Sequence, residues 1–193
     1  VVGGASIITE PDQSLSFCRL GAQSPEARCK SFDDDANGYI RSEGVCVMII
    51  KRLSDAQKDD DKILAIIKGS AINQDGKSKR FTAPSTVAQG LMHTAALKNA
   101  QLEPTEIDYI ETHGTGTKVG DPAEVRGILF AYEKYRTKEK PIVISSNKSN
   151  LGHMECNSGM ASIFKVILAL QNNTIPKVVH LKKPNNLIDW QNI

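Results

Sequence analysis

Short apolar runs and amphipathic segments alternate along the chain. Three of the runs, residues 1–8, 45–50 and 63–72, are continuous and rich in β-branched residues. This pattern is typical of strands that are buried on both faces of a sheet. Residues 51–62 are polar and charged with no apolar period, so we expect a solvated connection between the second and third strands.

The first predicted helix follows Ser85, which is a suitable N-cap residue. Val87, Leu91 and Ala95 recur at the spacing of one helix face, so we expect them to form the apolar stripe that faces the core. The pattern fades before Pro104, where we expect the helix to have ended.

The second predicted helix starts at Asp121. Asp121 is expected to accept hydrogen bonds as the N-cap, with Pro122 at the first helical position and Glu124 reaching back from the third. The helix continues with apolar residues at core spacing, namely Val125, Ile128, Leu129 and Tyr132. A third helix, at about residues 159–170, is apolar nearly all round, and this composition predicts burial.

Two more strands are predicted between these helices. Residues 107–112 and 141–146 are short apolar runs, and each precedes a loop of small and polar residues. The order along the chain is therefore strand, helix, strand, helix, strand, helix. This alternation predicts an α/β fold in which helices pack on a mixed or mostly parallel sheet.

Composition narrows the class of protein. With 40% apolar and 24% charged residues in 193, the chain has the balance of an ordinary globular domain. The net charge of +2 is not concentrated in a basic block, so nucleic acid is not an expected partner. No apolar run approaches the roughly 20 residues of a membrane span, and the first residues lack a signal-peptide layout. We therefore expect an intracellular, cytoplasmic protein with no membrane segment.

The four cysteines give no sign of a disulfide framework or a zinc site. Cys18, Cys29, Cys46 and Cys156 form no CxxC pair and have no regular spacing. Reduced thiols are the expected state. The chain opens on a strand-like segment without an initiator Met, so we expect it to be a piece of a longer protein.

The candidate chemistry lies in two loops, each of which follows a predicted strand. The first loop carries His113 in HGTGT, and the second carries Lys148 and His153 in NKSNLGH. In α/β sheets, ligands bind beyond the carboxyl ends of strands, so both histidines are expected to face one crevice. Glycines in both loops allow the backbone to come close to a ligand, and Thr115 and Thr117 offer hydroxyl groups.

Two neutral imidazoles in one crevice suit the stabilisation of an enolate. Each ring can donate one N–H to an oxygen that becomes negative during the reaction. Lys148 would add positive potential and keep His153 neutral, because a nearby like charge disfavours protonation. His93 and His180 lie outside these loops and are interpreted as packing or surface residues.

Other interpretations of these residues remain open at this point. A metal site could use Glu111 beside His113, although no ligand pair has the spacing of a metal site. Residues 33–44 imitate a calcium loop, but position twelve is Gly44 where a bidentate acid is needed. Cys156, three residues after His153, could act as a nucleophile but has no nucleophile-elbow signature.

Two segments closely resemble the two histidine motifs of type I β-ketoacyl synthases. They are residues 111–124, ETHGTGTKVGDPAE, and residues 145–162, SSNKSNLGHMECNSGMAS. Further similar segments are residues 29–56, 69–85 and 175–190, so the resemblance covers essentially the whole chain in the family's motif order.

The resemblance implies an α/β thiolase-like fold, built from two similar halves in layers of helix, sheet and helix. Here the fold would be incomplete. Residues 1 to about 50 would form the end of the N-terminal half, and residues from about 51 to 193 would form most of the C-terminal half.

The resemblance also implies roles for the loop residues. His113 and His153 correspond to the family's catalytic histidines and Lys148 to the lysine that accompanies them. Thr115 and Thr117 correspond to contacts with the phosphopantetheine arm of an acyl carrier protein. No cofactor is expected to bind directly, because that arm delivers the substrate.

The implied activity is an acyl transfer: decarboxylative Claisen condensation of a malonyl-type extender unit with a cysteine-bound acyl chain. The family's nucleophilic cysteine, in a TACSS-type elbow, is expected upstream of Val1, and its closing strands are expected beyond Ile193. The chain by itself is therefore expected to be inactive in condensation.

The expected partners are an acyl carrier protein domain, adjacent acyltransferase and processing domains of the same polypeptide, and a second copy in a homodimer. Residues 72–76, INQDG, favour a polyketide synthase over a type I fatty-acid synthase. A non-catalytic protein resembling a chain-length factor is the third alternative. The intact His113, Lys148 and His153 argue against it, because such proteins often lose these motifs.

Overall fold

The computed structural model describes residues 1–76, 84–135, 137, 140–191 and 193. Residues 77–83, in the middle of the similar segment 69–85, lie outside this description. The strands are β1 (Val2–Ser6), β2 (Gly44–Met48), β3 (Tyr109–Glu111) and β4 (Val143–Ser145). The α-helices are α1 (Asp12–Arg19), α2 (Leu53–Lys58), α3 (Thr86–Ala100), α4 (Gly120–Tyr132), α5 (Lys148–Leu151) and α6 (Ser158–Asn172), and single 3-10 turns span Pro104–Glu106, Glu133–Tyr135 and Glu155–Asn157.

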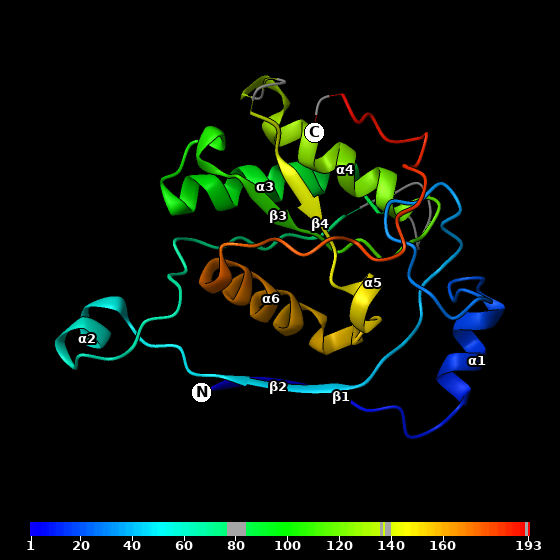
Figure 1. The fold of residues 1–193 in the computed structure, drawn as a ribbon, viewed down its shortest axis with the longest axis horizontal. Helices are drawn as coiled ribbons and strands as arrows, with labels where there is room; N and C mark the ends of the chain where they lie inside the picture. The colour runs from blue at the N-terminus through cyan, green and yellow to red at the C-terminus, as the bar shows by residue number, and fades with distance from the viewer. Residues whose placement is uncertain (77–83, 136, 138–139, 192) are drawn as a thin grey trace.

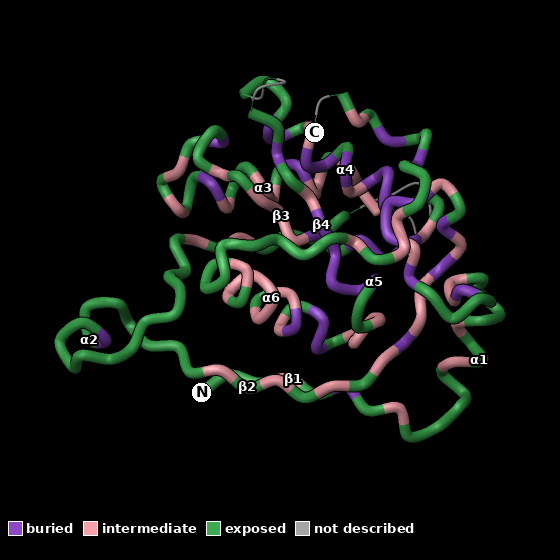
Figure 2. The backbone as a smooth tube through the Cα atoms, viewed as in Figure 1, coloured by how far each residue is buried: buried purple, intermediate pink, exposed green. Residues whose placement is uncertain are grey.

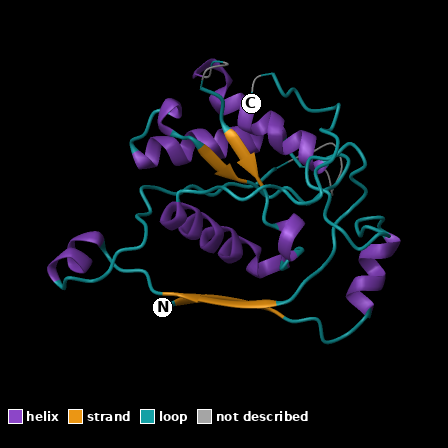
Figure 3. Ribbon diagram, viewed as in Figure 1, coloured by secondary structure: helices purple, strands orange, loops and turns teal. Residues whose placement is uncertain are grey.

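The strands form two separate pairs. β1 pairs with β2 antiparallel, with Gly4 opposite Cys46, and β3 pairs with β4 parallel, with Glu111 opposite Ser145. Helix α6 lies between the two strand pairs, while α3 and α4 pack together beside β3 and β4 (Figure 1). The helices and strands thus form layers, as Figure 3 shows, in agreement with the predicted α/β class with mixed strand directions.

The core sits around α4. One apolar cluster joins Leu97 of α3 to Ile128 and Tyr132 of α4, and a second joins Phe32, Val125 and Ile188. The core positions predicted for α4 are therefore confirmed at Val125, Ile128 and Tyr132. Figure 2 shows buried backbone concentrated along α4 and from β4 into α5, whereas β1, β2 and α2 are mostly exposed or half-buried.

The segment that follows α6 closes this core. The N–H of Asp34 donates to the Lys183 carbonyl (2.8 Å) and the N–H of Asn185 donates to the Phe32 carbonyl (2.9 Å). The Trp190 ring packs edge-on against Phe32, with ring centroids 6.4 Å apart. Residues far apart in sequence thus fix the loop that leads into the candidate site.

Residues 63–72 were predicted to form a strand, and that prediction is wrong for the described chain, where they adopt neither helix nor strand. A strand needs a neighbour that accepts its ladder hydrogen bonds. Here the segment instead runs past the end of α3, where the Ser70 N–H donates to the Asn99 side chain (3.0 Å). Three short α-helices, α1, α2 and α5, were not predicted; α2 lies inside the polar connection at residues 51–62, and α5 lies in the loop that carries Lys148.

The predicted core faces of α3 and α6 are also wrong in part. Val87, Leu91 and Ala95 are exposed, and α3 instead packs on α4 through Gly90 and Leu97. In α6 only Ser158 and Ala161 are buried, while Leu168 and Leu170 are more than half exposed. The apolar pattern identified helices correctly, but which face is covered depends on elements beyond each helix.

Among the described residues, no helix combines the length and the apolar character that crossing a membrane requires.

Candidate active site

The two histidine loops meet at the carboxyl ends of the parallel strands β3 and β4. His113 lies two residues after β3, and Lys148 and His153 follow β4 by way of the short helix α5. The imidazole rings of His113 and His153 are in edge-to-face contact, with centroids 5.2 Å apart and planes at 83°. The structure therefore brings together the two rings that the sequence placed in separate motifs.

His153 is held in one tautomer. Its Nδ1 atom lies 2.9 Å from the backbone N–H of Glu155, which can only donate, and 2.8 Å from the hydroxyl of Ser158. Nδ1 is therefore an acceptor, so the hydrogen of the neutral ring is on Nε2. The Ser158 hydroxyl must then donate to Nδ1 as well.

The His113 loop is braced from α4. Both oxygens of the Glu124 carboxylate accept backbone N–H groups, from His113 (2.6 Å) and from Gly114 (2.8 Å). Gly114 has φ +40°, and a Cβ there would lie 2.7 Å from Ser146, so the loop can come this close to β4 only with glycine. The loop position is thus set by α4 on one side and by β4 on the other.

The neighbouring Asp121 holds the second half of the same loop. One of its oxygens accepts the N–H of Gly116 (3.1 Å) and the other accepts the N–H of Phe32 (2.8 Å). We predicted that Asp121 and Glu124 would cap their own helix, and this prediction is wrong. Helix α4 starts at Gly120, and both carboxylates turn back to the glycine-rich loop, whose amides would otherwise lack acceptors.

Lys148 is buried, with only 2% of its surface exposed, and lies close enough to both histidines for its charge to act on them. Burial lowers the pKa of its ammonium, and the carboxylates of Glu124 and Glu111 partly counteract this effect. The pKa of His153 is lowered to about 4, by burial first and by the Lys148 charge second. The pKa of His113 is also lowered to about 4, by the same two causes and by the His153 ring.

His113 and His153 differ in how much of each residue is exposed to solvent. His113 is exposed, although neighbouring protein atoms partly desolvate its ring, and His153 is half-buried. With pKa values near 4, both imidazoles are neutral at neutral pH. The crevice therefore presents N–H donors on uncharged rings in the vicinity of the buried Lys148.

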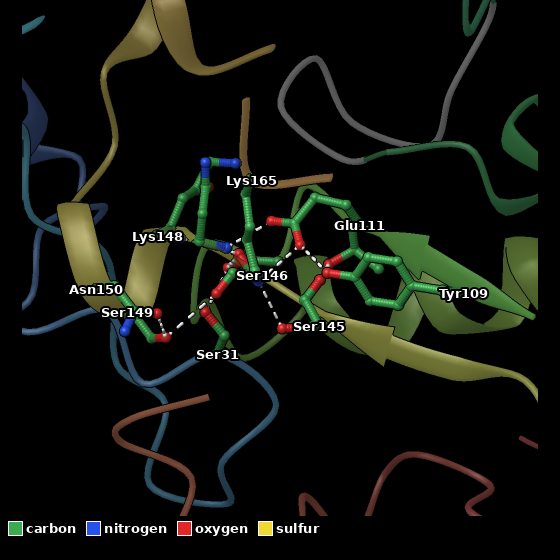
Figure 4. Close-up of polar contacts among 12 residues, drawn as sticks. Ser31, Tyr109, Glu111, Ser145, Ser146, Lys148, Ser149, Asn150 and Lys165 are labelled. Atoms are coloured by element: carbon green, nitrogen blue, oxygen red, sulfur yellow. Dashed lines mark hydrogen bonds and ion pairs between the residues drawn. The ribbon is translucent and has the colours of Figure 1, made fainter. Parts of the chain in front are cut away.

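A buried network of hydrogen bonds and one ion pair links the ends of β3 and β4 (Figure 4). The Glu111 side chain, 3% exposed, forms an ion pair with Lys165 of α6 (2.7 Å) and accepts the N–H of Asn147 (2.6 Å) and the Tyr109 hydroxyl. Lys165 also donates to the Ser145 hydroxyl (2.7 Å). Because Asn147 precedes Lys148, this network fixes both histidine loops to the same helix.

Sequence reasoning did not identify this network. Lys165 stands in a helix that was interpreted only as apolar, and Glu111 was considered only as a metal ligand. The available signal was a single lysine among the apolar residues 160–170, since a cation there needs a buried partner.

The two threonines of the HGTGT motif lie side by side. Their hydroxyl oxygens are 3.5 Å apart, and Thr117 Oγ1 accepts the N–H of Gly120 (3.1 Å). Thr115 is buried and Thr117 is half-buried. Because Thr117 Oγ1 accepts from Gly120, its own hydrogen remains able to donate to a polar ligand.

The other interpretations find no support in this geometry. The part of the chain that the structure describes contains no cluster of three metal-ligating side chains. In the calcium-like loop, the Asp33 carboxylate accepts the backbone N–H groups of Lys182 (2.6 Å) and Lys183 (2.9 Å). The Cys156 thiol is exposed and donates to the carbonyl of Ala5 on β1 (3.1 Å).

A hollow of about 600 Å³ adjoins His153. Its walls include Phe17 of α1, the side chains of Tyr39 and Arg41, and Cys156. The Tyr39 ring is 5.0 Å from the His153 ring, centroid to centroid. The hollow thus borders His153 on the side of the Tyr39 ring.

Two models of one protein family match most of the chain. Residues 1–56 match the family described as "Beta-ketoacyl synthase, N-terminal domain", and residues 64–182 match "Beta-ketoacyl synthase, C-terminal domain". The second match alone covers more than half of the chain.

Similar proteins include large polyketide synthases. The chain is 40% identical over 190 residues to polyketide synthase GfsE of Streptomyces halstedii, and the match covers 98% of this chain and 5% of that protein. It is 42% identical over 194 residues to a 6-methylsalicylic acid synthase of Arthrobotrys oligospora, and the match covers 100% of this chain and 11% of that protein. The chain thus spans a small part of the length of these relatives.

Among solved structures, a mutant form of the ketosynthase from module 6 of the bacillaene synthase from Bacillus subtilis 168 superposes with a TM-score of 0.94 and 38% identity. The superposition covers 99% of this chain and 34% of that one, so the chain spans about a third of a solved ketosynthase. The fold is therefore thiolase-like and represents part of such a domain. On the evidence of its two sequence matches and this superposition, the chain belongs to the β-ketoacyl synthase family.

Proposed function

We propose that this chain supplies the enolate-stabilising part of the active site of a β-ketoacyl synthase in a polyketide synthase. The observation that carries the proposal is the edge-to-face contact of the His113 and His153 imidazoles, with centroids 5.2 Å apart, and the lowered pKa that keeps both rings neutral. The similarity to polyketide synthases supports the polyketide product class. Fatty-acid synthesis by the same chemistry is the alternative.

In the proposed reaction, the carbon–carbon bond between a malonyl thioester and its carboxylate breaks, and CO₂ leaves. The electron pair stays on the remaining fragment as an enolate, whose negative charge is on the former carbonyl oxygen. His153 donates its Nε2–H to this oxygen, and the His113 ring supplies the second donor. Fixed donors aimed at a developing oxyanion commonly contribute about 3–4 kcal/mol each to the rate.

Lys148 supports this step through its charge. A nearby ammonium stabilises the developing negative charge and favours the neutral form of both imidazoles, in which Nδ1 of His153 can accept the Glu155 N–H. The enolate then attacks the thioester carbonyl of an acyl chain. A new carbon–carbon bond forms, and a thiolate leaves. We propose that this thiolate belongs to a cysteine outside the sequence given.

Thr115 and Thr117 are proposed to guide the phosphopantetheine arm that carries the malonyl group. The two hydroxyls are adjacent and follow His113 in the same loop, which supports this role. Thr117 is the better placed of the two to contact the arm, and the buried Thr115 orients it. The proposed partners are an acyl carrier protein, acyltransferase and processing domains of the same polypeptide, and a second copy in a homodimer.

The test uses the complete protein that contains this chain. His113→Ala and His153→Ala are made separately, and malonyl decarboxylation and condensation are measured as two reactions. We expect both rates to fall by about a hundredfold or more. His180→Ala is the matched control, because this histidine lies outside the crevice, and it should keep the wild-type rates.

Two outcomes would overturn the proposal. If both alanine variants decarboxylate malonyl groups at nearly the wild-type rate, the roles proposed for His113 and His153 are wrong. Absence of decarboxylation in the unaltered complete protein would instead indicate a non-catalytic member of the family.

A further inference from the structure

Glu155, two residues after His153, has an unusual backbone conformation. Its φ is +47°, in the left-handed region that L side chains rarely adopt. Glycine would adopt this conformation without the contact between Cβ and backbone that Glu155 has to accept. A glutamate at this position therefore points to a function for the side chain.

The side chain of Glu155 is held by Arg41. Arg41 Nε donates to one carboxylate oxygen (2.8 Å) and Nη2 donates to the other (2.9 Å). This bidentate arrangement fixes the relative orientation of both groups. The Arg41 side chain is only 5% exposed, so solvent screens the pair weakly.

Helix α1 fixes the remaining groups of Arg41. Nη1 donates to the Ser14 hydroxyl (2.8 Å), Nη2 donates to the Gln13 side chain (2.6 Å), and the guanidinium lies over the Phe17 ring, 5.7 Å from its centroid. These contacts fix the position of the Arg41 guanidinium independently of Glu155.

The segment that contains Arg41 also holds the backbone of His153. The His153 N–H donates to the Ile40 carbonyl (2.8 Å), and the Ser42 N–H donates to the His153 carbonyl (3.0 Å). These are the residues on either side of Arg41. The Arg41–Glu155 ion pair and these two backbone hydrogen bonds therefore connect the turn at His153 to the segment that contains Arg41. In this turn the Glu155 N–H donates to Nδ1 of His153.

We infer that Arg41 and Glu155 are positioning residues for His153: their ion pair holds the turn whose Glu155 N–H occupies Nδ1 and thereby keeps the donor hydrogen on Nε2. This inference rests on the proposed function of His153. It explains why residue 155 carries a carboxylate in a conformation that favours glycine. Neither side chain acts on the substrate in this account.

The test again uses the complete protein, and measures kcat and KM for malonyl decarboxylation. Glu155→Gly relieves the backbone strain but removes the ion pair. We expect kcat to fall about tenfold to a hundredfold, as when an orienting partner of a functional histidine is lost. KM should stay within about twofold, because the interaction lost acts on the reacting geometry.

Two further variants separate the pair from a general structural role. Glu155→Gln keeps an acceptor for Arg41 at the same length, so it should recover most of the activity lost in Glu155→Gly. Arg41→Met combined with Glu155→Gly should be no slower than the worse single variant, because both remove one interaction. Lys183→Met, which breaks the exposed pair with Asp34, is the control and should keep the wild-type kcat.

The outcomes distinguish this inference from the proposed function. If His153→Ala abolishes decarboxylation while Glu155→Gly and Arg41→Met keep the wild-type kcat, the inference is wrong and the function stands. If His153→Ala itself keeps the wild-type rate, the proposed function fails. If Glu155→Gly does not fold, Glu155→Gln and Arg41→Met decide the question, since a wild-type kcat in Arg41→Met overturns the inference.

Discussion

The Glu124 carboxylate binds the backbone N–H of His113 at 2.6 Å and the adjacent N–H of Gly114 at 2.8 Å. A side chain near the start of α4 thus holds the peptide that carries a site histidine. Burial raises the pKa of this carboxyl, and the two N–H groups act in the opposite direction. The carboxylate therefore has a positioning role rather than an exposed catalytic one.

Removing this brace should loosen the loop. Glu124→Ala removes the acceptor of two backbone amides, and an amide that water cannot then reach costs about 1–3 kcal/mol. We expect a lower free energy of unfolding in urea for the complete protein and a lower kcat for decarboxylation. Glu124→Gln keeps one acceptor and should lose less. An unchanged unfolding curve for Glu124→Ala would show that the two amides find other acceptors.

The buried pair of Glu111 and Lys165 gives a stability prediction. Lys165→Met leaves the Glu111 carboxylate without its cation, and breaking a buried pair in this way costs about 3–5 kcal/mol. The double variant Glu111→Gln with Lys165→Met removes the unpaired charge. We expect it to be more stable than Lys165→Met alone in urea unfolding.

Lys183→Met is the control for this comparison, since its pair with Asp34 is largely exposed at the lysine. It should change stability far less than Lys165→Met. Equal effects of the two substitutions would contradict the importance of burial in the Glu111 network.

Thr117 provides a prediction about substrate binding. Thr117→Val keeps the shape of the side chain and removes the hydroxyl. If the hydroxyl contacts the phosphopantetheine arm equally in the ground and transition states, KM for the carrier-bound malonyl substrate should rise about twofold to tenfold with little change in kcat. A change in kcat alone would instead place the hydroxyl at the reacting atoms.

Lys148→Met should change how the rate depends on pH. The Lys148 charge is one of the causes that lower the pKa of both histidines, so removing it should raise these pKa values from about 4 toward 6.5. The acidic limb of the decarboxylation rate should then move to higher pH, and the rate at neutral pH should fall. A limb in the same place as that of the wild type would contradict the electrostatic coupling.

The sequence predicted the features that depend on local order. Each histidine lies in the loop region that follows a strand, and parallel strands bring such loops to one edge of a sheet, so the sequence pattern predicted that His113 and His153 meet. The strands β3 and β4 and the helices α3, α4 and α6 were also predicted close to where they occur.

The partners that fix these loops could not be predicted in the same way. Arg41 and Glu155 are 114 positions apart, and no periodic pattern relates them. Asp121 and Glu124 matched a helix-capping signature, but the amides of the glycine-rich loop compete for the same carboxylates and bind them instead. Such contacts depend on how elements pack, which the pattern along one segment does not specify.

The pH profile of malonyl decarboxylation by the unaltered complete protein tests most directly whether His113 and His153 act as neutral imidazoles. Both imidazoles are neutral donors in the proposed reaction, and their pKa values are about 4. We therefore expect a rate that is flat through pH 6.5, the ordinary histidine pKa, and that falls only as the pH approaches about 4. A fall centred near 6.5 would mean that a site histidine titrates as an ordinary exposed one, and it would contradict the neutral pair.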